Sequence, residues 1–159
     1  MLKSGPTLLV WLTLAASVFA AEAPKGMLPI GKKGKALNTD FETGDLRDWT
    51  ATSTVTSAAF KVTQPWAAFL LGGGSHAETR VELVLVEGGK VFFTARGQNN
   101  ETLTPIVVDL AAQKNKEIFI RIVDEHTGGW GHVNFDDFRL HAQKPAFAAG
   151  CRSGMWWTT

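Results

Sequence analysis

Short apolar runs, each closed by a turn residue, fill most of this 159-residue chain and limit the folds open to it. From Ala36 onward, Gly, Asn or Asp interrupts the runs about every 8 to 12 residues. Within a run the side chains alternate, as Val81, Leu83 and Leu85 do against Glu82. Alternation of this period, with many β-branched and aromatic residues, indicates half-buried strands. The chain is therefore predicted to be all-β, an antiparallel β-sandwich.

Eight strands are expected, and one segment, 110–114, is able to form a helical turn. The glycine pair in 87–90 predicts a hairpin, because glycine adopts the positive φ angles of a tight turn. The expected strands are 36–41, 54–62, 66–71, 79–87, 90–95, 103–109, 117–124 and 131–140.

The N-terminal segment predicts export. Lys3 precedes an apolar stretch over 8–18, and small residues allow cleavage after Ala20. Residues 1–20 are therefore predicted to be a signal peptide, 21–35 a flexible leader rich in Lys, Gly, Pro and Ala, 36–144 the folded domain and 145–159 an unstructured tail. The protein is expected to be secreted or periplasmic, with no membrane contact once the signal is removed.

Charge and cysteine content exclude several classes of protein. Removing Lys3 with the signal leaves 16 − 1 = 15 basic residues against 15 acidic ones. Nucleic-acid binding needs a basic surface that displaces counterions, so no nucleic acid is expected as a partner. Cys151 is the single cysteine, so the exported chain has no internal disulfide.

The last expected strand changes its alternation partway along. Val133 and Phe135 are odd-numbered, whereas Phe138 and Leu140 are even-numbered. If all four face the core, an extra residue at Asp136-Asp137 must form a β-bulge. Alternatively, Phe135 or Phe138 packs on the opposite face of the sheet.

Carboxylates gather near both ends of the predicted domain. Asp40 and Glu42 lie in its first run, and Asp136 and Asp137 lie in its last. The first and last strands of a closed sandwich are often neighbours, which would bring the four acids together. Several carboxylates in oxygen-only geometry suit Ca²⁺. The alternative is that these residues bond their own backbone in turns.

A glycine-rich loop places an indole beside polar side chains. Between Arg121 and His132 the chain contains Asp124, Glu125, Gly128, Gly129 and Trp130. A sugar site needs an aromatic face for C–H groups and planar polar groups for hydroxyls. Arg80, which follows another glycine-rich turn, is expected to reach the same rim. The alternative is that Trp130 fills the core and His132 is an ordinary strand residue.

Two stretches together resemble a known family. They are the Asn-Thr-Asp-Phe-Glu-Thr-Gly run over 38–44 followed by Trp49, and the Gly-Gly-Trp-Gly-His-Val-Asn-Phe-Asp-Asp-Phe string over 128–138. Over about 37–141 the chain resembles galactose-binding-like carbohydrate-binding modules, closest to the fructan-binding modules of bacterial levanases. It is also similar to an N-terminal domain of secreted planctomycete proteins that carry haem-binding or cytochrome-like domains. Between Trp49 and Thr54 the chain is shorter than this family by some tens of residues.

The resemblance implies a jelly-roll fold, a ligand site built from loops and a structural Ca²⁺ between the first and last strands. The metal residues it implies are Asp40, Glu42 and Asp137. The ligand-binding residues it implies are Arg80, Arg121, Asp124, Glu125, Trp130 and His132.

These observations predict a secreted carbohydrate-binding module without catalytic activity, whose partner is an oligosaccharide or polysaccharide. The alternative is a structural or docking domain that binds other domains of a longer secreted redox protein. A glycosidase is a third hypothesis, because paired carboxylates can hydrolyse glycosides. No Ser–His–Asp or Cys–His pattern stands out.

Overall fold

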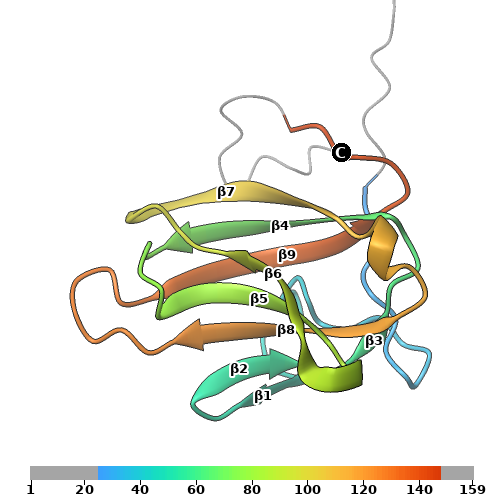
Figure 1. The fold of residues 1–159 in the computed structure, drawn as a ribbon, viewed down its shortest axis with the longest axis horizontal. Helices are drawn as coiled ribbons and strands as arrows, with labels where there is room; N and C mark the ends of the chain where they lie inside the picture. Colours follow the sequence, from blue (N-terminus) through green and yellow to red (C-terminus); the bar gives the residue numbers. More distant parts are fainter. Residues whose placement is uncertain (1–24, 148–159) are drawn as a thin grey trace, which may run out of the picture.

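The computed structural model describes residues 25–147, and its architecture is all-β (Figure 1). Two antiparallel sheets pack around one hydrophobic core, which confirms the predicted β-sandwich. The predicted signal peptide and most of the predicted tail lie outside the described residues. None of the helices in the described part of the chain has the length and apolarity that a bilayer span requires.

The larger sheet has the strand order β1-β2-β8-β5-β6, with β3 also paired to β8, and the smaller sheet has the order β7-β4-β9. The strands are β1 (Trp49–Ala51), β2 (Thr54–Ser57), β3 (Phe60–Lys61), β4 (Trp66–Gly73), β5 (Thr79–Leu85), β6 (Val91–Ala95), β7 (Asn100–Asp109), β8 (Glu117–Asp124) and β9 (Val133–His141). Two short 3₁₀ turns, η1 (Glu87–Gly89) and η2 (Ala111–Gln113), occupy the predicted hairpin and the predicted helical turn.

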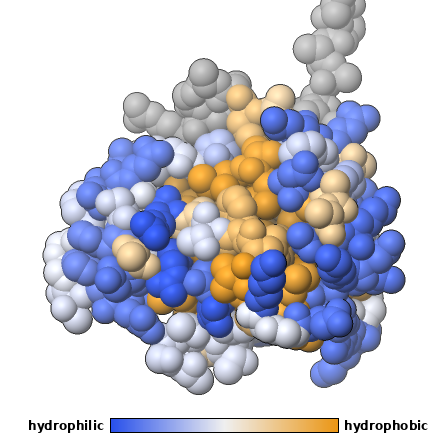
Figure 2. All heavy atoms as spheres, viewed as in Figure 1, coloured by the Kyte–Doolittle hydropathy of each residue, from blue (hydrophilic) through white to orange (hydrophobic). Residues whose placement is uncertain are grey.

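Alternation along the strands explains which face of each sheet is buried. Val81 and Leu83 of β5 and Ile118 and Ile120 of β8 are fully buried in the core. The residues between them face outward from the sandwich, as the polar Glu82 does. Figure 2 shows apolar surface in the middle of the viewed face, with hydrophilic surface around it. Strand β6 crosses this face in Figure 1 and is the last strand of its sheet.

The β-bulge predicted in the last strand is present. On β4, Ala68 pairs with Arg139 and Leu70 pairs with Asp136, so one residue of β4 faces two residues of β9. Asp137 has a φ of 51°, outside the extended region. The extra residue lets Phe135 and Phe138 both pack in the core, with ring centroids 5.4 Å and 5.9 Å from that of Phe69.

The first and last segments of the domain lie side by side, as the sequence predicted. Thr39 accepts a backbone hydrogen bond from Phe138, and its Oγ1 donates to the Phe138 carbonyl at 2.8 Å. Phe41 packs edge-on against Phe135, with ring centroids 6.3 Å apart. The prediction of a strand over 36–41 is wrong, however. This segment is a loop, attached to β9 by one backbone hydrogen bond and by side-chain contacts rather than by a ladder of backbone bonds.

The segment before Ala36 also contacts the sandwich. Met27 and Leu140 exchange backbone hydrogen bonds of 2.8 Å in both directions. Gly31 forms an isolated bridge with Phe60 of β3. The part of the predicted leader from residue 27 onward is therefore attached to both sheets.

Candidate functional site

Two loops meet at one end of the sandwich, and we call residues 74–78 and 125–132 the rim loops. The backbone N–H of Gly74 donates to the carbonyl of His132 at 2.8 Å. A Cβ on Gly74 would lie 1.9 Å from the carbonyl oxygen of Trp130, so only glycine permits this approach. The rings of His76 and His126 stack across the same junction, with centroids 3.7 Å apart. The rim loops therefore support each other.

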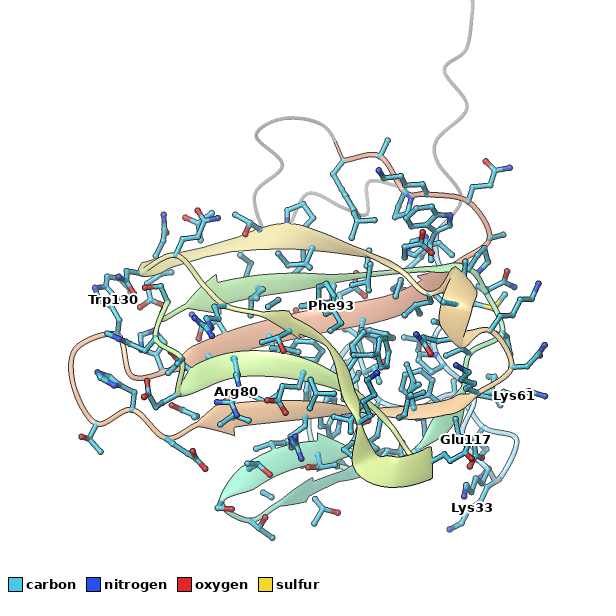
Figure 3. All side chains as sticks on the ribbon, viewed as in Figure 1. Lys33, Lys61, Arg80, Phe93, Glu117 and Trp130 are labelled. Carbon is cyan, nitrogen blue, oxygen red and sulfur yellow. The ribbon has the colours of Figure 1, made fainter. Side chains whose placement is uncertain are left out.

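Trp130 stands at the outer edge of the rim loops (Figure 3). Its side chain belongs to a residue that is 39% exposed, so the indole is not a core plug. Its φ is 60°, in the left-handed region that large side chains rarely adopt. Such strain persists only where the surroundings enforce it, and it is concentrated at functional sites. The indole lies 5.8 Å from the ring of His132, at an interplanar angle of 33°.

A carboxylate from β7 links the rim to the last strand. Glu101 Oε1 lies 2.9 Å from His132 Nε2, and Glu101 Oε2 accepts a hydrogen bond of 2.7 Å from Asn134 Nδ2. Sequence reasoning missed Glu101, because nothing near it in the sequence indicates a contact with His132 or Asn134. We call Glu101, His132 and Asn134 the polar fan. It lies next to the exposed indole.

A hollow of about 600 Å³ adjoins the polar fan and is lined by residues of β9 and of the 38–48 loop. Its carboxylates come from the 38–48 loop and from β9, and Asn134 belongs to both the fan and the hollow. The lining residues are Asp40, Phe41, Glu42, Gly44, Leu103, Val133, Asn134, Phe135 and Asp136. Burial raises the pKa of Asp136 above its ordinary value, and the negative charges of Asp137, Glu42 and Asp40 raise it further. The hollow therefore holds one carboxyl group that accepts a proton readily.

Arg139 lies between two of the three residues predicted to hold calcium. Its Nη2 is 2.9 Å from Asp40 Oδ2, and its Nε is 2.6 Å from Asp137 Oδ1. The third predicted ligand, Glu42, is exposed. Within residues 25–147, no three His, Cys, Asp or Glu side chains are grouped so that they could hold a metal ion. The arrangement does not fit a calcium ion unless the guanidinium moves, and calcium binding stays a prediction.

Arg80 and Arg121 meet on the outer face of the larger sheet rather than beside Trp130. Both hold the carboxylate of Glu82, which is 4% exposed. Arg80 Nε is 2.6 Å from Glu82 Oε1, and Arg121 Nη2 is 2.5 Å from Glu82 Oε2. Arg80 Nη1 also donates to the carbonyl of Ala77 at 2.6 Å, which ties this cluster to the rim loops. Sequence reasoning missed Glu82, the residue that joins the two arginines.

The remaining candidates, Asp124 and Glu125, are exposed where β8 ends. The backbone N–H of Glu125 donates to the carbonyl of Glu78 at 3.0 Å, which holds the two rim loops together. The six predicted ligand residues thus lie in three neighbouring groups. Trp130 and His132 lie at the polar fan, Asp124 and Glu125 lie where β8 ends, and Arg80 and Arg121 lie beside Glu82. Among the described residues, no hydrogen bond, ion pair or ring contact joins Trp130 to either arginine.

Comparison with known proteins gives one informative match. The chain is 36% identical over 107 residues to "Putative glycosyl hydrolase ecdE" from Aspergillus rugulosus. The match covers 67% of this chain but only 14% of the relative's length. No family model matches the chain, and no solved structure matches it.

This match contradicts the prediction that the protein is not an enzyme. The relative is described as a glycosyl hydrolase, so the similarity points toward an enzyme family. The prediction of no catalysis rested on the absence of a Ser–His–Asp or Cys–His pattern and on the assignment of the acidic residues to metal binding or turns. Neither argument takes into account that the match spans only 14% of the relative's length.

Proposed function

We propose that this chain binds carbohydrate at the exposed indole of Trp130 and the adjoining polar fan. The proposal rests on one observation: a strained, exposed indole stands beside three polar side chains that are linked by hydrogen bonds through Glu101. A sugar ring offers an apolar C–H face and a rim of hydroxyl groups. The indole suits the first, and the fixed carboxylate, imidazole and amide suit the second.

The polar fan is already ordered before a ligand arrives. Glu101 uses both carboxylate oxygens on His132 and Asn134, so the three side chains restrain each other. Binding then requires little additional ordering of side chains, which reduces the entropic cost of association. Each group keeps further hydrogen-bonding capacity, because a carboxylate oxygen accepts more than one hydrogen bond and an amide has a second N–H and an oxygen.

The hollow gives the bound oligosaccharide a second subsite. Asn134 bonds Glu101 and also lines the hollow, so the two features are continuous. A sugar stacked on Trp130 could place its neighbour against Leu103 and the carboxylates at the other end. The name of the fungal relative supports carbohydrate as the ligand class, and the resemblance to fructan-binding modules makes fructans the first probes.

Isothermal titration calorimetry with inulin- and levan-derived oligosaccharides, after screening on a glycan array, tests the proposal. Trp130→Ala is expected to weaken binding at least tenfold and to leave the melting temperature close to that of the unsubstituted protein. Val86→Ala is the matched control, because Val86 is also an exposed apolar residue, at 41%, and lies at η1. Well-folded protein that binds no glycan, or a Trp130→Ala protein that binds as before, would refute the proposal. A large loss of stability without any glycan binding would favour the docking-domain alternative.

A second candidate function is glycoside hydrolysis in the hollow, and the acid–base character of Asp136 favours it. A general acid must be protonated near neutral pH, and burial moves the pKa of Asp136 in that direction. Glu42, which is exposed and lines the same hollow, is the candidate for the second carboxylate. In this function the acid protonates the leaving oxygen while the second carboxylate attacks the sugar or activates water.

Release of reducing sugar from the oligosaccharides bound in the titrations tests this second function. Hydrolysis that Asp136→Asn abolishes while binding persists would support it. Hydrolysis that survives this substitution would place the activity elsewhere. Glu78→Gln serves as the control, because Glu78 is an exposed carboxylate of the rim loops and does not line the hollow.

A further inference from the structure

The outer face of the larger sheet presents three arginines, and we call Arg80, Arg96 and Arg121 the arginine face. Arg80 is on β5 and Arg121 is on the adjacent β8, where it pairs in register with Glu82. Arg96 follows the last residue of β6, and the register that pairs Val81 with Ala95 sets it opposite Arg80. Their neighbours along the strands, such as Val81 and Ile120, fill the core. The arginines therefore lie on the side that faces away from it.

One buried carboxylate fixes the geometry of this face. Glu82 holds Arg80 through Oε1 and Arg121 through Oε2, with its own side chain 6% exposed. The two arginine side chains remain 27% and 33% exposed. Burial alone would raise the pKa of Glu82, but the hydrogen bonds from Arg80 and Arg121 outweigh it and lower the pKa below its ordinary value. Glu82 is therefore ionised at neutral pH, and the guanidinium pair retains one surplus positive charge.

Several donors on this face have no partner within the described chain. Arg80 Nη2 and Arg121 Nη1 make no hydrogen bond to residues 25–147. Arg96 is exposed and forms no ion pair there either. Two threonines occupy neighbouring positions on this face, because Thr56 pairs in register with Arg121 and Thr94 with Glu82. The three guanidiniums and the Glu82 carboxylate together carry a net charge of 3 − 1 = +2.

We infer that the arginine face binds an anionic group of a saccharide, namely the carboxylate of a uronic acid. The inference rests on the proposed function in taking a carbohydrate as ligand, and it adds the chemical class of that carbohydrate. Guanidinium groups match carboxylates with paired N–H donors, and a guanidinium held in place by Glu82 loses little entropy on binding. The threonine hydroxyls supply hydrogen bonds to the sugar ring. A sulfate ester offers the same oxygens and is the other source of such a group.

The position of the face fits an acidic chain that also reaches Trp130. Arg80 and Trp130 lie toward the same end of the molecule in Figure 3, whereas Lys33 and Glu117 lie toward the other. The bond from Arg80 to Ala77 connects the face directly to the rim loops. One oligosaccharide could therefore use the indole for stacking and the arginines for charge.

Calorimetry with oligogalacturonate, its methyl ester and a neutral inulin oligosaccharide tests the inference at low and at physiological salt. The acid is expected to bind at least tenfold more tightly than the ester, and its affinity is expected to fall as salt rises. Arg96→Gln is expected to reduce this preference several-fold without lowering the melting temperature. Arg121→Lys, which keeps the charge but loses the fork of donors, should reduce it as well. Lys33→Gln removes one charge at the opposite end and should change nothing.

The outcomes separate this inference from the proposed function. Equal affinity for acid and ester, or an Arg96→Gln protein that behaves like Lys33→Gln, refutes the arginine face while inulin binding through Trp130 still stands. Tighter binding of a sulfated galactan than of oligogalacturonate supports the face and identifies sulfate as the group it selects. Binding of no glycan at all overturns both proposals.

Discussion

Glu82→Gln tests how the larger sheet is held at its outer face. The substitution keeps the shape of the side chain, removes the charge that pairs with Arg80 and Arg121, and turns an N–H group toward the guanidiniums. Removing one partner of a buried ion pair costs about 3–5 kcal/mol. Because the arginines are about one-third exposed, solvent screens them, and the lower end, about 3 kcal/mol, applies. For a folded unit of about 120 residues this lowers the melting temperature by roughly 12 °C.

The same substitution has a predicted pH dependence. The folded-state pKa of Glu82 is lowered, so its contribution to stability is present above the ordinary value of 4.5 and is lost as pH falls through the folded-state pKa. The difference between wild type and Glu82→Gln should therefore be largest at neutral pH and shrink below pH 4.5.

Urea unfolding at several pH values, followed by circular dichroism, measures both effects. Glu87→Gln is the matched control, because it removes one exposed carboxylate near η1 and should change the free energy of unfolding by less than about 0.5 kcal/mol. A Glu82→Gln protein within 1 kcal/mol of the control at neutral pH, or a deficit of about 3 kcal/mol that persists at acid pH, would refute the reasoning.

Three further predictions follow from the rim and the hollow. Gly74→Ala should destabilise the protein and weaken glycan binding together, because the new Cβ would meet the Trp130 carbonyl at 1.9 Å; binding that survives it would show that the rim loops adapt. Asp136→Asn should raise the melting temperature at neutral pH, and the gain should vanish on acidification, because a group with a raised pKa stabilises the fold only while it is protonated. A difference in melting temperature between Asp136→Asn and the unsubstituted protein that is the same at neutral and at acid pH would contradict this. If Asp40, Glu42 and Asp137 bind calcium, millimolar Ca²⁺ should raise the melting temperature and a chelator should reverse the rise. A melting temperature that Ca²⁺ does not change would refute calcium binding.

Much of the fold could be predicted because alternation is a local property. The alternation of apolar residues around Val81 and Ile120 predicts which side chains are buried. The change from odd-numbered to even-numbered core residues between Phe135 and Phe138 predicts the position of the bulge. The strand predicted over 36–41 was wrong because its apolar residues anchor a loop. Leu37 is buried and Phe41 stacks on Trp49, with centroids 5.2 Å apart, without any ladder of backbone bonds.

The site could be predicted only in part, because its decisive contacts join residues far apart in the sequence. The glycine-rich string around Trp130 indicated an exposed indole. Nothing near Glu101 indicated that it would bond His132, 31 positions later. Glu82 likewise looked like an outward strand residue, and only the pairing of β5 with β8 brings Arg121 to it. The enzyme prediction was wrong for a related reason, since the 107 matched residues span only 14% of the relative's length.

The most direct test of carbohydrate binding at the rim observes the indole itself. In a nitrogen–proton correlation spectrum, each tryptophan contributes one Nε1–H signal. Trp49 provides an internal control, because its Nε1–H donates to the Asn38 carbonyl at 2.7 Å in the interior. Titration with the best-binding oligosaccharide is expected to shift the Trp130 signal along a saturable curve that matches the calorimetric affinity, while the Trp49 signal stays in place. Saturating the protein with ligand while the Trp130 signal remains unmoved would contradict the account.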